Sequence, residues 1–298
     1  MAPAGPLAEE AVDRALDRLE RWGWRPLLGR NSRGRWGYLS GTDDERLADL
    51  QAAIDSEEND AIWFLRGGYG TMRIVDRVDW RPLVRRPRPV IGFSDNTVLH
   101  LALQRAGVVS FHGPHPAVET LPPFSIELLH RAVTLAEPLG QLPLPEEGEG
   151  VETVVEGVAE GPLVGGNLVL LAATVGTFWA LRTRGALLFF EEVGEATYRL
   201  DRLLTQLRLS GALDGVKGIL VGALSECPDE GAPNTPALSD LLRDRLGDLG
   251  VPVARGFPFG HQPYNWTLPL GVRARLDATA GTVEILEPAV APRALGES

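Results

Sequence analysis

The sequence is poor in cysteine, in lysine and in long apolar runs. Its single cysteine, Cys227, excludes an intrachain disulfide and any metal site built on cysteine ligands. No apolar run approaches the ~18 residues that a membrane-spanning helix needs. The first residues also lack the basic and apolar regions of a signal peptide. These absences predict a cytoplasmic protein without a membrane partner.

Positive charge is scarce as well, because the chain of 298 residues has a net charge of −11 and Lys217 is its only lysine. The one basic cluster, residues 81–88, is interrupted by prolines, which predicts a solvated loop. A nucleic-acid partner is therefore excluded, since it would need a basic face. With 44% hydrophobic residues, a chain of this length is globular and large enough for two modest domains.

The most informative stretch is residues 89–105. β-Forming residues before Ser94 predict a short buried strand, and the apolar pattern after it predicts a helix that ends at Gly107. Ser94 would then lie at a sharp strand-to-helix turn, where the first N–H groups of the helix can stabilise an oxyanion. A serine here is equally typical of a helix N-cap, and Asn96 replaces the second glycine of a nucleophile elbow. This stretch alone leaves both interpretations open.

The surrounding pattern predicts an α/β fold in two domains. A strand over 61–65, a glycine turn and a helix over 72–78 precede the Ser94 strand, which is typical of a doubly wound half. We expect an amino-terminal domain over 1–135, a linker over 136–160 and a carboxy-terminal domain over 161–298. Further strands are predicted over 25–28, 108–111, 186–190, 218–224, 251–257, 266–277 and 282–286, and further helices over 126–135, 168–175, 198–209 and 236–249.

Gly67 and Gly68 lie in the turn that follows the strand over 61–65. The turn has neither a Walker lysine nor the spacing of a dinucleotide site, so a phosphate ligand is disfavoured. Its N–H groups could instead form part of an oxyanion hole beside Ser94, and a purely structural βα turn is the alternative.

A nucleophilic serine needs a base, and the chain holds five histidines. His100 and His130 lie on predicted helices and are expected to be structural, while His115 has no evident partner. His112 and His261 each follow a predicted strand, which is where loops often present catalytic groups. Spacing alone does not decide between these two.

The acid that orients the base would come from the end of the strand over 186–190, where Glu191 and Glu192 follow an apolar run. A carboxylate in this position is either a helix-capping acid or a site residue. Successive residues on a strand point to opposite faces, so only one of the two can reach a cleft.

Motifs along nearly the whole chain are Phe-Leu-Arg-Gly-Gly-Tyr-Gly (64–70), Gly-Phe-Ser-Asp (92–95), Phe-His-Gly-Pro (111–114), Gly-Gly-Asn-Leu (165–168), Glu-Glu-Val-Gly-Glu (191–195), Tyr-Arg-Leu-Asp-Arg (198–202), Gly-Phe-Pro-Phe-Gly-His (256–261) and Thr-Leu-Pro-Leu-Gly (267–271). In this order they resemble the motifs of the serine L,D-carboxypeptidases. That family includes muramoyl-tetrapeptide carboxypeptidases and microcin C immunity peptidases.

The resemblance implies a triad in which Ser94 is the nucleophile, His261 the base and Glu191 the orienting acid. Family members usually carry Glu-Asp where this chain has Glu191 and Glu192, so the residues themselves leave that choice open. His112 then takes a supporting role.

The resemblance also implies an oxyanion hole made by the N–H groups of Asp95 and of Gly67 or Gly68. It places Asn167, within the Gly-Gly-Asn-Leu motif, among the substrate-contacting residues. The family begins with a strand before the stretch over 2–6, so we expect this strand to be missing or the start codon to be misassigned.

The implied reaction is hydrolysis of an L,D amide without metal or cofactor, which releases terminal D-Ala from murein tetrapeptides. Two alternatives are cleavage of a peptidyl or aminoacyl nucleotide such as processed microcin C, and a non-catalytic protein that binds murein peptides. We further expect a flavodoxin-like amino-terminal half, a β-rich, barrel-like sheet in the carboxy-terminal half, and a homodimer.

Overall fold

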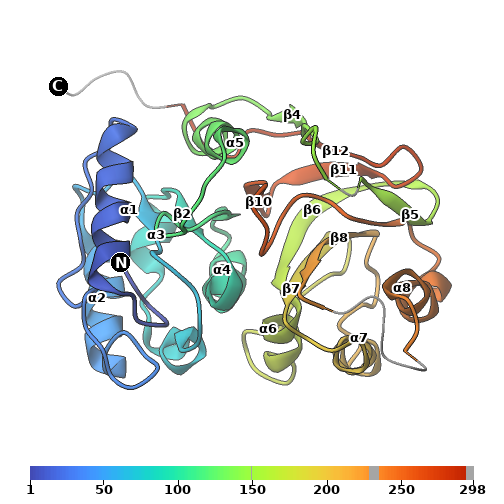
Figure 1. The fold of residues 1–298 in the computed structure, drawn as a ribbon, viewed down its shortest axis with the longest axis horizontal. Helices are drawn as coiled ribbons and strands as arrows, with labels where there is room; N and C mark the ends of the chain where they lie inside the picture. The colour runs from blue at the N-terminus through green and yellow to red at the C-terminus, as the bar shows by residue number, and fades with distance from the viewer. Residues whose placement is uncertain (149, 228–234, 293–298) are drawn as a thin grey trace.

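The computed structural model describes residues 1–148, 150–227 and 235–292. Two sheets lie side by side, each accompanied by helices (Figure 1). This mixed α/β arrangement confirms the fold class that the sequence predicted. No helix in the described ranges is long and apolar enough to cross a membrane.

The first half contains α1 (Glu9–Arg21), α2 (Asp43–Asp55), β1 (Ile62–Trp63), α3 (Arg81–Arg85), β2 (Val90–Gly92), α4 (Thr97–Arg105), β3 (Ser110–His112) and α5 (Pro123–Thr134). Its sheet has the order β1-β2-β3-β10, in which β1, β2 and β3 are parallel. The strand β10 (Leu268–Leu270) comes from far along the chain and runs antiparallel to β3, with Leu268 opposite His112. The carboxy-terminal half therefore supplies an edge strand to the amino-terminal sheet.

The second sheet contains β4 (Gly140–Gln141), β5 (Glu152–Val155), β6 (Val158–Asn167), β7 (Leu187–Val193), β8 (Gly218–Ser225), β9 (Val253–Arg255), β11 (Arg273–Asp277) and β12 (Thr282–Ile285). Their order is β4-β12-β11-β6-β7-β8-β9-β5, with parallel pairing from β6 through β9. In Figure 1, α6 (Leu168–Ala173), α7 (Thr197–Leu209) and α8 (Leu238–Leu246) lie on one side of this sheet. No pairing joins β4 to β5 in the described ranges, so the expected barrel-like closure is not confirmed.

Strand β7 divides the apolar interior of the second half into two layers. Leu187 and Phe189 pack in a cluster that contains the rings of the 257–266 loop, whereas Leu188 and Phe190 pack among the leucines of α7 and α8. All four side chains are buried, and each such burial contributes about 1.5–3 kcal/mol to folding. The strict alternation fixes which face each following residue takes, including Glu191.

Three local predictions are wrong. Residues 72–78 form two short 3₁₀ turns, Thr71–Arg73 and Val75–Arg77, because Thr71 is tied to the Ser94 turn by hydrogen bonds. Residues 81–85 form α3 rather than a loop, since a proline in the first turn of a helix costs no hydrogen bond. Residues 25–28 form no strand.

Met1 lies beside β1 and the residues that follow it. Its carbonyl accepts the N–H of Leu65 at 2.9 Å, and its amino group donates to the carbonyl of Trp63 at 3.1 Å. Met1 thus makes the kind of backbone contacts that a neighbouring strand would make.

Candidate active site

Ser94 lies in a tight turn between β2 and α4, as the sequence predicted. It opens a 3₁₀ turn, Ser94–Asn96, that leads directly into α4. Its φ of 62° lies in the left-handed region, which costs a non-glycine residue roughly 1–2 kcal/mol. Such strain persists where the surrounding structure enforces it, and it is common at functional sites.

The glycine turn lies directly against Ser94. A Cβ built on Gly67 would lie 2.7 Å from Cβ and 2.8 Å from Oγ of Ser94, and 3.1 Å from the backbone nitrogen of Asp95. Within the described part of the chain, the N–H groups of Gly67, Gly68 and Asp95 have no hydrogen-bond acceptor. The turn and the start of the helix therefore bring free N–H donors close to Ser94.

Asp95 links the Ser94 turn to the glycine turn through hydrogen bonds with Thr71. Its buried carboxylate accepts the N–H of Thr71 at 2.9 Å, and the hydroxyl of Thr71 donates to the carbonyl of Asp95 at 2.6 Å. Burial raises the pKa of Asp95, although these hydrogen bonds oppose the shift. The side chain of Asp95 is thus occupied in the interior, and its backbone N–H stays free.

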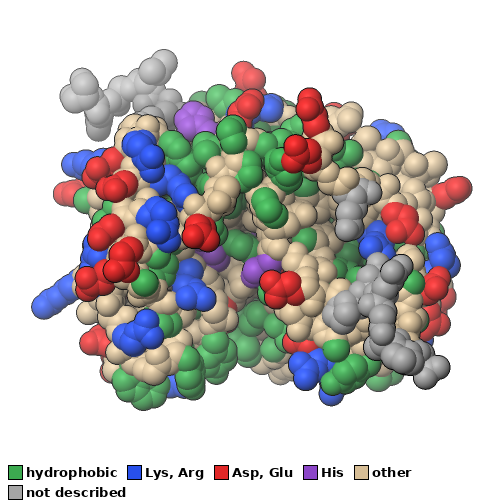
Figure 2. Space-filling view, viewed as in Figure 1, with side chains coloured by type: hydrophobic (Ala, Val, Ile, Leu, Met, Phe, Trp, Pro, Cys, Tyr) green, Lys and Arg blue, Asp and Glu red, His purple; other side chains and the backbone are tan. Residues whose placement is uncertain are grey.

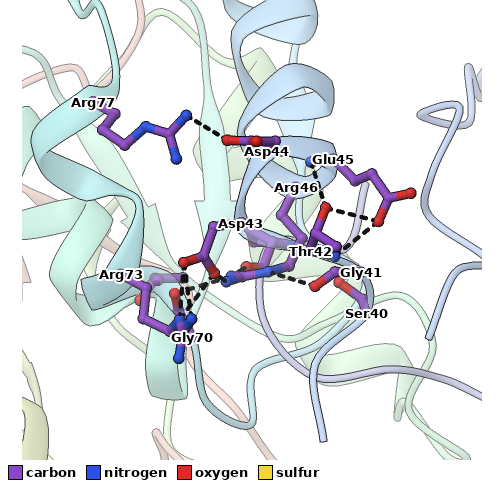
Figure 3. Close-up of polar contacts among 12 residues, drawn as sticks. Ser40, Gly41, Thr42, Asp43, Asp44, Glu45, Arg46, Gly70, Arg73 and Arg77 are labelled. Atoms are coloured by element: carbon purple, nitrogen blue, oxygen red, sulfur yellow. Dashed lines mark hydrogen bonds and ion pairs between the residues drawn. The ribbon is translucent and has the colours of Figure 1, made fainter. Parts of the chain in front are cut away.

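Arg46 holds the glycine turn from the other side (Figure 3). This residue of α2 is almost fully buried, and its guanidinium donates to the carbonyls of Pro3, Gly41 and Gly70. It also pairs with Asp43, which in turn binds Arg73. A buried charge that satisfies several carbonyls fixes the position of the loop it contacts.

His261 lines the same cleft, and Glu191 contacts it from the interior on a different element. Nδ1 of His261, in the loop after β9, lies 2.6 Å from Oε2 of Glu191 on β7, and Glu191 is fully buried. Gly260, with φ of 106°, packs so closely that a Cβ on it would lie 2.6 Å from Cβ of Glu191. Burial lowers the pKa of His261, but the hydrogen bond and charge of Glu191 outweigh this effect and raise the pKa above its ordinary value.

Glu192 points to the opposite face of β7 and caps α6. It accepts the N–H groups of Val169 at 2.7 Å and Val193 at 2.9 Å, and the side-chain amide of Asn167 at 3.0 Å. Burial raises its pKa despite these donors. The strand end therefore carries both kinds of carboxylate that the sequence suggested, one in contact with His261 and one at a helix N-terminus.

Ser94 and His261 line one cleft of about 330 Å³. Figure 2 shows this face of the molecule hollowed between the two halves, with histidine side chains visible inside. No hydrogen bond joins Ser94 Oγ to His261 in the described structure, a separation common in sites without substrate. The other lining groups are Arg66, Gly67, Gly68, Phe93, His115 and apolar side chains from the start of α1, from Leu65 and from 117–118.

Two predicted residues lie away from this cleft. His112 is fully buried among the rings of Phe93, Phe189 and Phe259, and neither ring nitrogen has a partner in the described chain. Asn167 is buried at the start of α6, where it holds Glu192 and receives a hydrogen bond on Oδ1 from Leu170. Both contribute to the packing behind the site rather than to its surface.

Two residues that the sequence reasoning passed over belong to the site. His115 lines the cleft, its Nε2 accepts the N–H of Phe93 at 3.3 Å, and the same atom lies 2.9 Å from Oδ1 of Asn96. Arg66 is the second, and it precedes the glycine pair within the motif itself. The described residues contain no cluster of three or more His, Cys, Asp or Glu that could hold a metal.

Comparison with known proteins assigns the family. Residues 1–113 match the LD-carboxypeptidase N-terminal domain and residues 160–276 match the LD-carboxypeptidase C-terminal domain. The chain therefore belongs to the LD-carboxypeptidase family of serine-type carboxypeptidases, which confirms the resemblance read from its motifs.

Individual relatives cover nearly the whole chain. A Streptomyces coelicolor protein is 42% identical over 97% of this chain and 93% of its own. The murein tetrapeptide carboxypeptidase of Pseudomonas aeruginosa is 35% identical, covering 93% of this chain and 92% of its own. The crystal structure of muramoyltetrapeptide carboxypeptidase from Oxalobacter formigenes matches with a TM-score of 0.85 and 30% identity, covering 98% of both chains.

Proposed function

We propose that this protein releases terminal D-Ala from murein tetrapeptides, with Ser94, His261 and Glu191 as its reacting triad. The observation that carries the proposal is the 2.6 Å contact between His261 Nδ1 and Glu191 Oε2 at the cleft that Ser94 lines. The names of the Pseudomonas and Oxalobacter relatives support the choice of substrate.

In the first half of the reaction, Ser94 Oγ attacks the carbonyl carbon of the amide, and His261 Nε2 takes the hydroxyl proton. Glu191 fixes the proton of His261 on Nδ1 and stabilises the imidazolium that forms. The oxyanion develops near the free N–H groups of Asp95 and of Gly67 or Gly68. The carbon–nitrogen bond then breaks, and His261 returns the proton to the amine of the departing D-Ala.

In the second half, water enters the place that the amine has left. His261 takes a proton from this water, the oxygen attacks the acyl ester of Ser94, and the shortened peptide leaves as the serine regains its proton. The histidine is neutral at the start of each half, so the same contact with Glu191 serves both steps.

The test is hydrolysis of two substrate classes by the whole chain. Wild-type protein should release D-Ala from a murein tetrapeptide, and acid-quenched enzyme should carry the tripeptide acyl group on the peptide that contains Ser94. The Ser94→Ala variant should lose about 10⁴-fold or more in kcat, because a triad member is absent. Activity of Ser94→Ala within tenfold of wild type would exclude the proposed nucleophile.

An aminoacyl sulfamoyl nucleoside is the second substrate in this assay, since the Escherichia coli microcin C7 self-immunity protein MccF is 26% identical over 96% of this chain. Turnover of the nucleoside without release of D-Ala would reassign the substrate and keep the triad. Binding of the tetrapeptide without turnover of either compound would indicate a non-catalytic binding protein.

A further inference from the structure

The cleft beside Ser94 differs in charge from the rest of the molecule. The chain carries a net charge of −11, yet the residues that line this cleft include no aspartate or glutamate. Its fixed positive charge comes from Arg66. An anionic ligand entering the cleft therefore meets a cation and no lining carboxylate that would repel it.

Most N–H donors of the Arg66 guanidinium are available to a ligand. One guanidinium nitrogen, Nη1, donates to the carbonyl of Pro6 at 2.9 Å, and the side chain has no carboxylate partner in the described part of the chain. A guanidinium offers five N–H donors in a planar fork, so most remain available. The side chain is also exposed, which makes it accessible from solvent.

The position of Arg66 suits the end of a peptide. Its Cα lies about 3.8 Å from that of Gly67, as for any neighbouring residues, and Gly67 abuts Ser94. In a carboxy-terminal residue, the carboxylate carbon lies two bonds beyond the scissile nitrogen. A long side chain rooted this close to the nucleophile can therefore reach that carboxylate while the scissile carbonyl contacts Ser94.

Three alanines are among the apolar groups that line the same cleft as Arg66. Ala8 and Ala11 come from the start of α1, and Ala117 comes from the loop after β3. A methyl group can pack against such an apolar wall. His115 beside it is held neutral, because burial first and then the charges of His261 and Arg66 lower its pKa well below the ordinary value.

We infer that Arg66 binds the terminal carboxylate of the peptide substrate and that Ala8, Ala11 and Ala117 receive the methyl group of its last residue. This pairing restricts cleavage to the final amide of the chain, since an internal residue presents no carboxylate to Arg66. The inference rests on the proposed peptidase function, and it assigns that function's selectivity to one side chain.

The experiment compares two peptides that differ at one group: a murein tetrapeptide with a free terminal D-Ala, and the same peptide with this residue as its amide. Wild-type enzyme should prefer the free acid by about 10- to 100-fold in kcat/KM, the range expected for a charge-assisted bidentate contact. Arg66→Gln should lower kcat/KM for the acid by a similar factor and leave the value for the amide within about threefold, so the preference collapses.

Two further variants serve as controls. Arg66→Lys should restore part of the preference, because lysine keeps the charge and loses the fork. Arg81 is an exposed arginine of α3 that pairs with Asp79 and is not among the residues that line the cleft, so Arg81→Gln should leave both rates unchanged. A wild-type preference that persists in Arg66→Gln would overturn the inference while leaving the proposed function intact. Absence of release from either peptide by the wild type would overturn the proposed function and this inference with it.

Discussion

Gly67 lies against Ser94 with no room for a side chain between them. A Cβ on Gly67 would fall 2.7 Å from Cβ of Ser94 and 3.1 Å from the nitrogen of Asp95. Real Cβ atoms do not approach other atoms this closely, so either the glycine turn or the serine turn would have to move. A side chain at this position would therefore displace the free N–H groups of the two turns relative to one another.

We therefore expect Gly67→Ala to lower kcat by about 100-fold or more, which is the cost of misplacing one oxyanion donor. The matched control is Gly247→Ala, whose added Cβ would meet only the flexible side chain of Arg243 at 3.6 Å. Steady-state kinetics on the tetrapeptide check both. Wild-type kcat in Gly67→Ala would show that the glycine turn takes no part in the reaction.

The strain at Ser94 can be measured by comparing two inactive variants. Ser94→Ala and Ser94→Gly both remove the hydroxyl, but φ of 62° costs alanine and not glycine. The free energy of unfolding should be higher for Ser94→Gly by about 1 kcal/mol. Ser210 is the control, because its φ of −79° suits both residues and alanine should there be the more stable. Equal denaturant midpoints at Ser94 would contradict a strained turn.

The Ser94 turn could be predicted because a strand, a turn and a helix are local features. Spacing could not predict the contact between Glu191 and His261, since it joins residues from β7 and from a distant loop; only the family resemblance implied it. Spacing left His112 and His261 equal, and what separates them is tertiary burial. His112 is covered because the rings of Phe93, Phe189 and Phe259 pack around it, whereas His261 lies in a loop that reaches the cleft.

The errors of the sequence analysis have the same origin. The turns at 71–77 follow from hydrogen bonds between Thr71 and Asp95, and the spacing of apolar residues in the sequence does not predict such bonds. His115 lies in a loop without pattern, and only its contact with Phe93 reveals its place at the site. The expected homodimer and the cytoplasmic location stay predictions.

The raised pKa of His261 predicts how activity depends on pH. Burial lowers the pKa of His261. The contact with Glu191 and the charges of Glu191 and Glu192 raise this pKa by more than burial lowers it, so it lies above the ordinary value of 6.5. A general base must be neutral, so kcat/KM should rise with pH and level off above this raised value. In Glu191→Gln the favourable charge is gone, and the acidic limb should shift to lower pH. Profiles of kcat/KM from about pH 5 to 9 check this, and a limb that Glu191→Gln leaves in place would contradict the assignment.

His112 predicts a loss of stability in acid. Burial first, and then the charges of neighbouring histidines, hold its pKa well below 6.5, so the folded state keeps the ring neutral while the unfolded state takes up a proton. Stability should therefore be lost as the pH falls below about 6.5, by about 1.4 kcal/mol per pH unit for this one group. His112→Phe removes the titration and fits a site already lined by phenylalanine rings. Its urea-unfolding free energy should fall less steeply between pH 6.5 and 5 than that of the wild type, and parallel curves would refute the prediction.

Glu191 and Glu192 offer the sharpest pair of variants, because they are neighbours with opposite tasks. Glu191 is buried behind His261 and contacts it, while Glu192 faces α6 and accepts two N–H groups and the amide of Asn167. Glu191→Gln should lower kcat by about 10³- to 10⁴-fold, since an amide cannot stabilise imidazolium. Its melting temperature should change little.

Glu192→Gln should do the reverse. A neutral amide keeps the shape but offers one acceptor oxygen where the carboxylate offers two, so one buried donor loses its partner at a cost of about 1–3 kcal/mol. The melting temperature should fall by several degrees while kcat stays within about threefold of wild type, because nothing at the cleft changes. Thermal unfolding and single-turnover kinetics on both variants make the comparison. If Glu192→Gln proved the inactive one, the roles of the two strand faces would be exchanged and the triad would have to be redrawn.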